Sequence, residues 1–189
     1  MQDSGIRSTP RHTPTVIPRT IWLTGLSGAG KSTLASGLGQ QLKEAGYACY
    51  VLDGDVLRNG LCRDLGFSAE DRSENIRRVA EVARLMNEAG IIVIAALISP
   101  YQADRLMARN IVGTERFIEA YISTPIAVCE SRDPKGLYRR AHAGELQGFT
   151  GVSAPYEHPE NPEVSINTAL MPPAHCVAEL MRHVLDNVE

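Results

Sequence analysis

Cysteine is scarce in this sequence. Four cysteines stand far apart along the 189 residues, without a CxxC pair. We therefore expect neither a zinc site nor a disulfide framework, because both need closely spaced or regularly arranged cysteines. Four free thiols, buried or half-buried, are expected instead, and a reducing cytoplasm fits them best. The four are Cys49, Cys62, Cys129 and Cys176.

Charge of one sign and long apolar runs are also missing. The chain has 19 Lys and Arg against 22 Asp and Glu, so its net charge of −3 gives no general electrostatic argument for binding nucleic acid or a membrane. The longest apolar run, residues 91–98, suits a buried strand and is far too short to span a bilayer. The N-terminus lacks the apolar core of a signal peptide. A soluble globular protein is the expected class.

Strand and helix patterns alternate along most of the chain. Residues 1–18 are rich in Pro, Thr, Ser and Arg and are expected to be a flexible tail, with a single domain over residues 19–189. The alternation predicts an α/β fold, with a parallel sheet covered by helices on both faces and a ligand beyond the carboxyl ends of the strands. Strands are expected at 21–24, 48–52, 91–98, 117–122 and 164–167, and helices at 32–45, 73–89, 102–111, 126–131 and 174–188.

The stretch GLSGAGKST, residues 25–33, carries the clearest motif. It lies between a strand pattern and a helix pattern, and it fits G-x-x-x-x-G-K-[ST]. The glycines let the backbone approach an anion closely, and the positive end of the following helix faces the same anion. Lys31 can reach the β- and γ-phosphates, and the Ser32 hydroxyl can ligate Mg²⁺. The motif predicts a nucleoside triphosphate site, and an ordinary glycine-rich turn is the alternative.

Residues 132–162 break the alternation of strands and helices. A long irregular segment in a compact domain is usually functional or disordered. This segment is basic, with Arg132, Lys135, Arg139 and Arg140 near its start, and such side chains would face phosphates. We therefore interpret the segment as a lid rather than a solvated loop.

Two acids flank a glycine in LDGDVLR, residues 52–58, where the second strand ends. Phosphoryl transfer needs an acceptor hydroxyl in line with the γ-phosphate, and a carboxylate can accept its proton or orient it. Asp53 lies closer to the strand end than Asp55 and is the better candidate. A capping or turn role is the alternative for this pair. Arg58 could hold an anionic group of a substrate, or could be an ordinary surface arginine.

The stretch RDLGFSAEDRSENIRR, residues 63–78, adds side chains suited to a nucleotide. Arg72 and Asn75 are three residues apart and could share one face at a helix start. Phe67 could stack on a base, although such a residue taken alone is more often a core anchor. After the third strand, where many P-loop proteins place an acid, the chain has Ser99. Its hydroxyl could contact a substrate or cap the next helix.

Seven motifs in this order resemble those of the adenylylsulfate kinases (APS kinases): GLSGAGKST, LDGD, RDLGFSAEDRSENIRRVAEVA, ISPY, CESRDPKGLY, GELQGFTG and PYEHPENPE. The resemblance covers nearly everything from Ile21 to Thr168. It implies a P-loop kinase that uses ATP and Mg²⁺ to phosphorylate the 3′-hydroxyl of adenosine 5′-phosphosulfate (APS), giving PAPS and ADP in sulfate assimilation. It also implies a homodimer and, as a candidate partner, an ATP sulfurylase.

The resemblance also implies roles for single residues. Lys31 and Asp53 would be catalytic, with Asp53 near the acceptor hydroxyl and Ser32 on Mg²⁺. Arg132, just before the lid, is a candidate contact of the ATP adenine, and Ser99 matches a serine that becomes phosphorylated in some family members. The ATP phosphates would be held by Gly28, Ala29, Gly30, Lys31, Ser32 and Thr33. The APS pocket would be lined by Asp55, Arg58, Phe67, Arg72, Asn75, Ile98, Ser99, Lys135, Gly148 and Phe149.

Three positions depart from the residues usual in that family. Val56 stands where DGDN has Asn, Leu97 where a Phe precedes ISP, and His142 where the lid has Arg. These departures leave open a P-loop kinase acting on another small hydroxylated metabolite. A second alternative is a nucleotide-binding regulatory domain with weak catalysis, against which the retained Asp53 argues.

Overall fold

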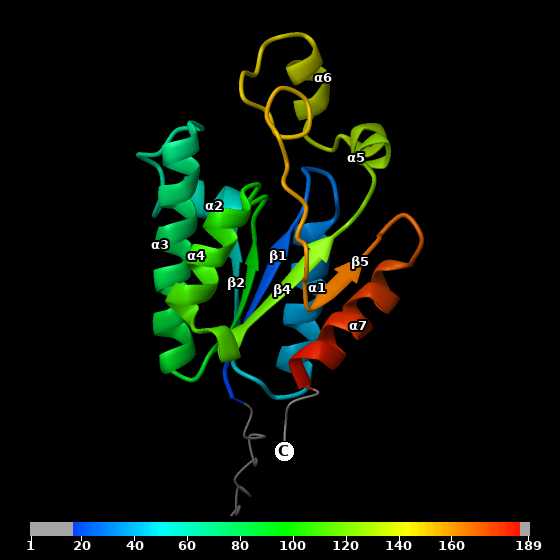
Figure 1. The fold of residues 1–189 in the computed structure, drawn as a ribbon. Helices are drawn as coiled ribbons and strands as arrows, with labels where there is room; N and C mark the ends of the chain where they lie inside the picture. The colour runs from blue at the N-terminus through cyan, green and yellow to red at the C-terminus, as the bar shows by residue number, and fades with distance from the viewer. Residues whose placement is uncertain (1–16, 186–189) are drawn as a thin grey trace, which may run out of the picture.

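Five strands form the central sheet of the structure, a computed structural model that describes residues 17–185. The strand order is β2-β3-β1-β4-β5, and each pair of neighbours is parallel. All carboxyl ends therefore meet at one edge, the upper edge in Figure 1. The strands are β1 (Thr20–Thr24), β2 (Cys49–Asp53), β3 (Ile92–Ala96), β4 (Phe117–Ile122) and β5 (Val164–Ile166).

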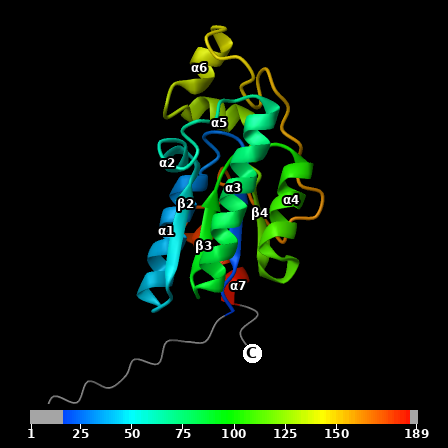
Figure 2. The ribbon, with the colours of Figure 1, turned by 90° about the vertical axis from the view of Figure 1, so that its left-hand side faces the viewer.

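Helices cover both faces of this sheet (Figure 1). α1 and α7 pack together on one face, and α3 and α4 pack together on the other, the face turned to the viewer in Figure 2. α5 and α6 lie above the carboxyl edge of the sheet (Figures 1 and 2). The helices are α1 (Lys31–Glu44), α2 (Gly54–Arg58), α3 (Ala69–Glu88), α4 (Gln102–Val112), α5 (Ile126–Arg132), α6 (Leu137–His142) and α7 (Pro173–Leu185), with a 3-10 turn at Thr114–Arg116.

The central strand β1 joins the two halves of the core. Its side chains alternate between the faces of the sheet, as they must in a strand. Ile21 and Leu23 belong to the cluster under α1 and α7, while Trp22 belongs to the cluster under α3 and α4. All five residues of β1 are buried, as are all five of β3, which explains why these strands read as continuous apolar runs.

The expected alternation of strands and helices is confirmed, with bounds shifted by a few residues. α3 begins at Ala69 rather than near residue 73, because the Ser68 hydroxyl accepts a hydrogen bond from the backbone N–H of Asp71 and so caps the helix earlier. The sequence patterns did not predict α2, or α6 inside the segment 132–162. The expected tail lies outside the described residues except for Ile17 and Pro18, which belong to no helix or strand.

The structure of residues 17–185 bears on the expectations about cysteines and about membrane-spanning segments. The four cysteines are all free, with Cys49 half-buried and the other three buried, as expected. Among the described helices, none combines the length and the apolar character that a membrane crossing requires.

The buried side chain of Arg105, on α4, ties three segments together at the carboxyl edge of the sheet. Its exposed fraction is 3%, and its Nε donates to a carboxylate oxygen of Glu119 on β4 at 2.7 Å. Its two terminal nitrogens donate to the carbonyl oxygens of Ser99 and Glu157, each at 2.8 Å. The loop after β3 and the chain returning from the segment 132–162 therefore share one anchor.

We predict that Arg105→Met lowers the free energy of unfolding by about 3–5 kcal/mol, because it removes the close partner of the Glu119 carboxylate and of two carbonyl groups. Glu119 then keeps only the contact with Arg109 at 3.7 Å, and the Ser99 carbonyl only that with the Thr24 hydroxyl at 3.4 Å. Urea unfolding followed by the fluorescence of Trp22, the single tryptophan, measures the loss. The control is Arg84→Met, which removes exposed ion pairs to Glu81 and Glu88 and should cost less than about 1 kcal/mol. Equal losses in the two variants would contradict the anchoring role.

Candidate active site

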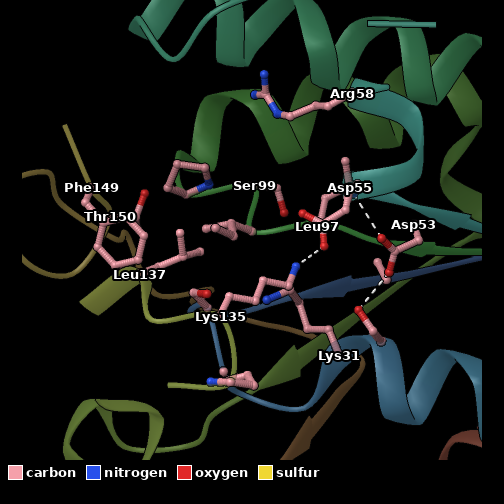
Figure 3. A pocket seen from close by; sticks show the side chains of 18 of the residues that line it. Lys31, Asp53, Asp55, Arg58, Leu97, Ser99, Lys135, Leu137, Phe149 and Thr150 are labelled. Carbon is pink, nitrogen blue, oxygen red and sulfur yellow. Dashed lines mark hydrogen bonds and ion pairs between the residues drawn. The ribbon is translucent and has the colours of Figure 1, made fainter. Parts of the chain in front are cut away.

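One cavity of about 830 Å³ opens at the carboxyl edge of the sheet. Its walls come from the phosphate loop before α1, from α2 and the start of α3, from the end of β3, and from the segment 132–150. In Figure 3, Asp53 and Asp55 lie side by side on one wall, and Leu137, Phe149 and Thr150 lie on the opposite wall. The site residues expected from the sequence all line this cavity except Ala29.

The phosphate loop can adopt its path only because two of its residues lack a Cβ. A Cβ on Gly25 would lie 2.7 Å from the carbonyl oxygen of Ile122, and a Cβ on Gly28 would lie 2.9 Å from that of Cys129. Both glycines also have positive φ, 148° and 73°, which other residues rarely adopt. The loop leads into Gly30, the N-cap of α1, so the unpaired N–H groups of the first helical turn open on the cavity.

Lys31 follows this loop and folds back on it. Its ammonium donates to the carbonyl oxygens of Gly25 and Leu26, each at 2.8 Å. Burial lowers the pKa of this ammonium from 10.5 to about 8, although the nearby carboxylates of Asp53 and Asp55 act in the opposite direction. A bound anion would favour the charged form further, since it adds opposite charge to that of the two carboxylates.

Ser32 and Asp53 bring two oxygen groups together beside Lys31. The Ser32 hydroxyl donates to one carboxylate oxygen of Asp53 at 2.7 Å. The other oxygen accepts from the backbone N–H of Asp55 at 2.9 Å, so Asp53 also caps α2. Asp53 thus does have the capping role that was its alternative, and it still lines the cavity. Hydroxyl and carboxylate oxygens suit Mg²⁺, which takes one or two protein ligands together with water and phosphate oxygens.

Asp55 and Lys135 form an ion pair that joins α2 to the segment 132–150 (Figure 3). Both side chains are exposed at the cavity, with 67% and 52% of their side-chain surface open. An exposed pair of this kind contributes little to stability, so its members can exchange partners readily. Lys135 is therefore available to an anionic ligand at small cost.

Arg58, Phe67 and Arg72 form one wall of the cavity. The Phe67 ring is 63% exposed, which rules out the core-anchor alternative, and the Arg58 guanidinium lies 4.4 Å from its centroid. Arg58 also donates to the carbonyl oxygen of Gly66 at 2.8 Å. Arg72 donates to the carbonyl oxygen of Gly148 at 2.9 Å, and burial lowers the pKa of its guanidinium. The arrangement offers positive charge next to an open aromatic face.

Two buried oxygens in this cavity lack a hydrogen-bond partner among residues 17–185. They are Oδ1 of Asn75, on α3, and Oγ1 of Thr150, at the end of the segment 132–150. Buried polar groups are rarely left unpaired in proteins, and each costs free energy while it is. Both oxygens thus mark positions where a ligand group could be accommodated.

Ser99 lies in the middle of the loop between β3 and α4 and is buried. Its hydroxyl accepts from the indole N–H of Trp22 at 3.1 Å, and its φ of 40° lies in the left-handed region, which residues other than glycine rarely adopt. The alternative that Ser99 caps the next helix is wrong, because Tyr101 is the N-cap of α4 and the N–H of Gln102 at that end donates to the Glu157 carboxylate at 2.6 Å. A strained backbone at the cavity floor is typical of functional sites.

Arg132 reaches the phosphate loop from the end of α5. Its guanidinium donates to the hydroxyl of Thr168 at 2.8 Å and to the carbonyl oxygen of the same residue at 3.1 Å. Thr168 lines the cavity, yet the sequence reading did not single it out. Its position directly after the last strand was the available signal, because ligands of parallel sheets gather at strand ends.

The three positions that depart from the residues usual in the kinases that the sequence resembles lie in different surroundings. Val56 is 69% exposed and does not line the cavity. His142 pairs with Glu130 at 3.0 Å and does not line it either. Leu97 does line the cavity and is buried in the core cluster under α3 and α4. A change in the ligand would therefore act through Leu97 rather than through Val56 or His142.

Comparisons with known proteins show the family to which the chain belongs. The sequence model of the family described as Adenylylsulphate kinase matches residues 17–167. The adenylyl-sulfate kinase of Escherichia coli O6:K15:H31 is 54% identical over 166 residues, covering 88% of this chain and 80% of that protein. The APS kinase CysC of Mycobacterium tuberculosis, solved in complex with AMPPNP and APS, is 42% identical with a TM-score of 0.87, over 92% of this chain and all of that one.

A more distant solved structure shares the fold alone. The gluconokinase of Sinorhizobium meliloti 1021 has a TM-score of 0.59 at 16% identity, over 92% of this chain and 95% of that one. Kinase folds of this kind thus extend beyond the matching family.

We predict that binding of MgADP weakens as the pH rises through about 8, because only the ammonium form of Lys31 counters phosphate charge. At one pH unit above that pKa about a tenth of the free protein is competent, so the apparent Kd should rise about tenfold. Calorimetric titrations between pH 7 and 9.5 measure it. Lys31→Arg, which keeps its charge, should flatten the profile, and an identical profile in both proteins would contradict the assignment.

Proposed function

The chain belongs to the adenylylsulphate kinase family, and from this we propose that it transfers the γ-phosphoryl group of ATP to the 3′-hydroxyl of APS, giving PAPS and ADP. The observation that carries the proposal is the shared cavity. A phosphate loop, the Asp53 carboxylate and the wall of Arg58, Phe67 and Arg72 line one space, so a donor and a nucleotide acceptor can meet there. Phosphoryl transfer depends mainly on positioning the two substrates and stabilising charge, and it needs no covalent intermediate with the protein.

The donor half of the site would hold the triphosphate. Amide N–H groups of the phosphate loop and the first turn of α1 bind its oxygens, and Lys31 exchanges the carbonyls of Gly25 and Leu26 for the β- and γ-phosphates. Mg²⁺, when bound, would neutralise charge on the phosphates, and Ser32 and Asp53 are the residues that would hold it. Lys31 itself stabilises negative charge as the phosphoryl group leaves ADP.

The acceptor half would bind APS through its base and its charged tail. Arg58 and Arg72 offer positive charge to the phosphosulfate, and Phe67 and Phe149 offer faces for the adenine. Lys135 would leave Asp55 for the substrate. Asp53 would orient the 3′-hydroxyl for in-line attack and accept its proton as the new P–O bond forms.

The segment 132–162 would act as a lid over both substrates. It is tied to the body of the protein by the pairs Lys135–Asp55 and Arg72–Gly148, so substrate contacts and closure involve the same groups. Closure excludes water, which would otherwise compete with the acceptor hydroxyl. Four free cysteines support a cytoplasmic location for the enzyme. A homodimer and a sulfurylase partner are proposed on the family resemblance alone.

We predict that the purified protein releases ADP from MgATP in proportion to added APS, with equimolar PAPS identified by mass spectrometry. The acceptor surface and the lid argue for this dependence, because both would be superfluous in an ATPase. Coupled ADP detection with and without APS measures it. ATP binding without APS-dependent ADP would refute the proposal and leave another acceptor, or a regulatory domain, to be tested with a panel of hydroxylated metabolites.

We predict that Asp53→Asn lowers kcat about 10²- to 10⁴-fold, because the amide can still cap α2 but cannot accept the proton. Steady-state kinetics with ATP and APS measure the change. Asp64→Asn is the matched control, since Asp64 pairs with Arg78 and does not line the cavity. Near-normal kcat in Asp53→Asn would show that another group takes the proton.

A further inference from the structure

Two threonine hydroxyls lie under the phosphate loop, at the ends of neighbouring strands. Thr124 follows β4 by two residues and Thr168 follows β5 by two residues. Their Oγ1 atoms lie 3.0 Å and 2.9 Å from the carbonyl oxygen of Ala29, and 2.8 Å from each other. Thr124 is 4% exposed, so this contact is sheltered from water. The carbonyl of Ala29 is therefore held on the protein side of the loop.

The orientation of this carbonyl decides where the next amide points. Residues 17–185 contain no cis peptide bond, and in a trans peptide the C=O and the N–H point in opposite directions. With the Ala29 oxygen turned toward Thr124 and Thr168, the N–H of Gly30 points toward the cavity. This agrees with the lining, which includes Gly30 and omits Ala29. Gly30 by itself restrains this peptide little, because glycine adopts a wide range of φ values, including the observed 105°.

We infer that Thr124 and Thr168 are positioning residues for nucleotide binding, which hold the Ala29–Gly30 peptide so that the Gly30 N–H faces the phosphates. The inference rests on the proposed function in taking a nucleotide as the bound anion. Neither residue contacts the phosphates through its own hydroxyl; each acts through the peptide. The contact of Arg132 fits this role as well. Its guanidinium donates to the oxygen of the Thr168 hydroxyl, which leaves the hydroxyl hydrogen of Thr168 free to point at Ala29 or Thr124.

The two hydroxyls are partly redundant. They carry two hydrogens for three contacts, so when one is lost the other can still donate to the Ala29 carbonyl. Losing one should therefore weaken binding modestly, and losing both should leave a buried carbonyl unpaired and the peptide free to turn. Effects larger than the product of the single effects are the sign of such a shared role.

The experiment measures the Kd of MgADP by calorimetry for T124V, T168V and the double variant. Valine keeps the shape of threonine and removes only the hydroxyl. This matters at Thr168, whose methyl group packs close to Gly30. We expect about a threefold rise in Kd for each single variant and about a thirtyfold rise for the double variant. T124S and T168S, which keep the hydroxyl, should bind within about twofold of the parent protein.

The matched control is T20V. Thr20, on β1, is buried like Thr124, but its hydroxyl donates to Asn87 at 2.7 Å, and it does not line the cavity. Its loss should lower thermal stability without changing the Kd of MgADP. In turnover assays, T124V, T168V and the double variant should have a raised KM for ATP, while their KM for APS stays within about twofold of that of the parent protein.

A Kd for the double variant within twofold of the parent would overturn the inference, as would serine variants as weak as the valine variants. If the double variant does not fold, the valine and serine variants at each single position decide by the same comparison. MgADP binding needs no acceptor, so an absence of APS-dependent turnover would refute the proposed function without affecting this result.

Discussion

The close approach between the phosphate loop and the chain beneath it is the constraint on which the site depends. Gly25 and Gly28 lie so near the carbonyl groups of Ile122 and Cys129 that a side chain at either position would push the loop off the sheet. This contact sets the start of α1, and with it the positions of Lys31 and Ser32. The residues on α2 and α3 that we propose to bind the acceptor can serve only because the loop lies within reach of Asp53.

Binding in this cavity is an exchange of partners rather than the filling of an empty charged pocket. The ammonium of Lys31 is held by loop carbonyls, Lys135 by Asp55, and Arg72 by the carbonyl of Gly148. Each cation must give up one contact to gain another, so the net gain per contact is smaller than its gross strength. The exchange also couples recognition to closure, because two of these contacts join the lid segment to the rest of the protein.

Much of the fold and of the site could be predicted from the sequence, because it depends on local patterns. A continuous apolar run indicated the buried strand at residues 91–98, and the strand predicted at residues 117–122 has its observed bounds. The glycine pattern indicated the phosphate loop, and Asp53 and Ser99 near strand ends indicated the same edge of the sheet, because parallel strands place their carboxyl ends at one edge. Short helices such as α2 and α6 escaped prediction, since five or six residues give too few repeats for helical periodicity.

The sequence by itself thus determined the phosphate loop, the order of strands and helices, and the chemical types of residue gathered at one edge. Only the tertiary structure decided which of them meet. It placed Val56 outside the cavity and Leu97 inside it, although both stand next to family motifs. It also brought Thr124 and Thr168, which are 44 residues apart in the sequence, to the carbonyl oxygen of Ala29. The physical reason is that strand pairing and side-chain direction are long-range properties, which no local pattern of residues records.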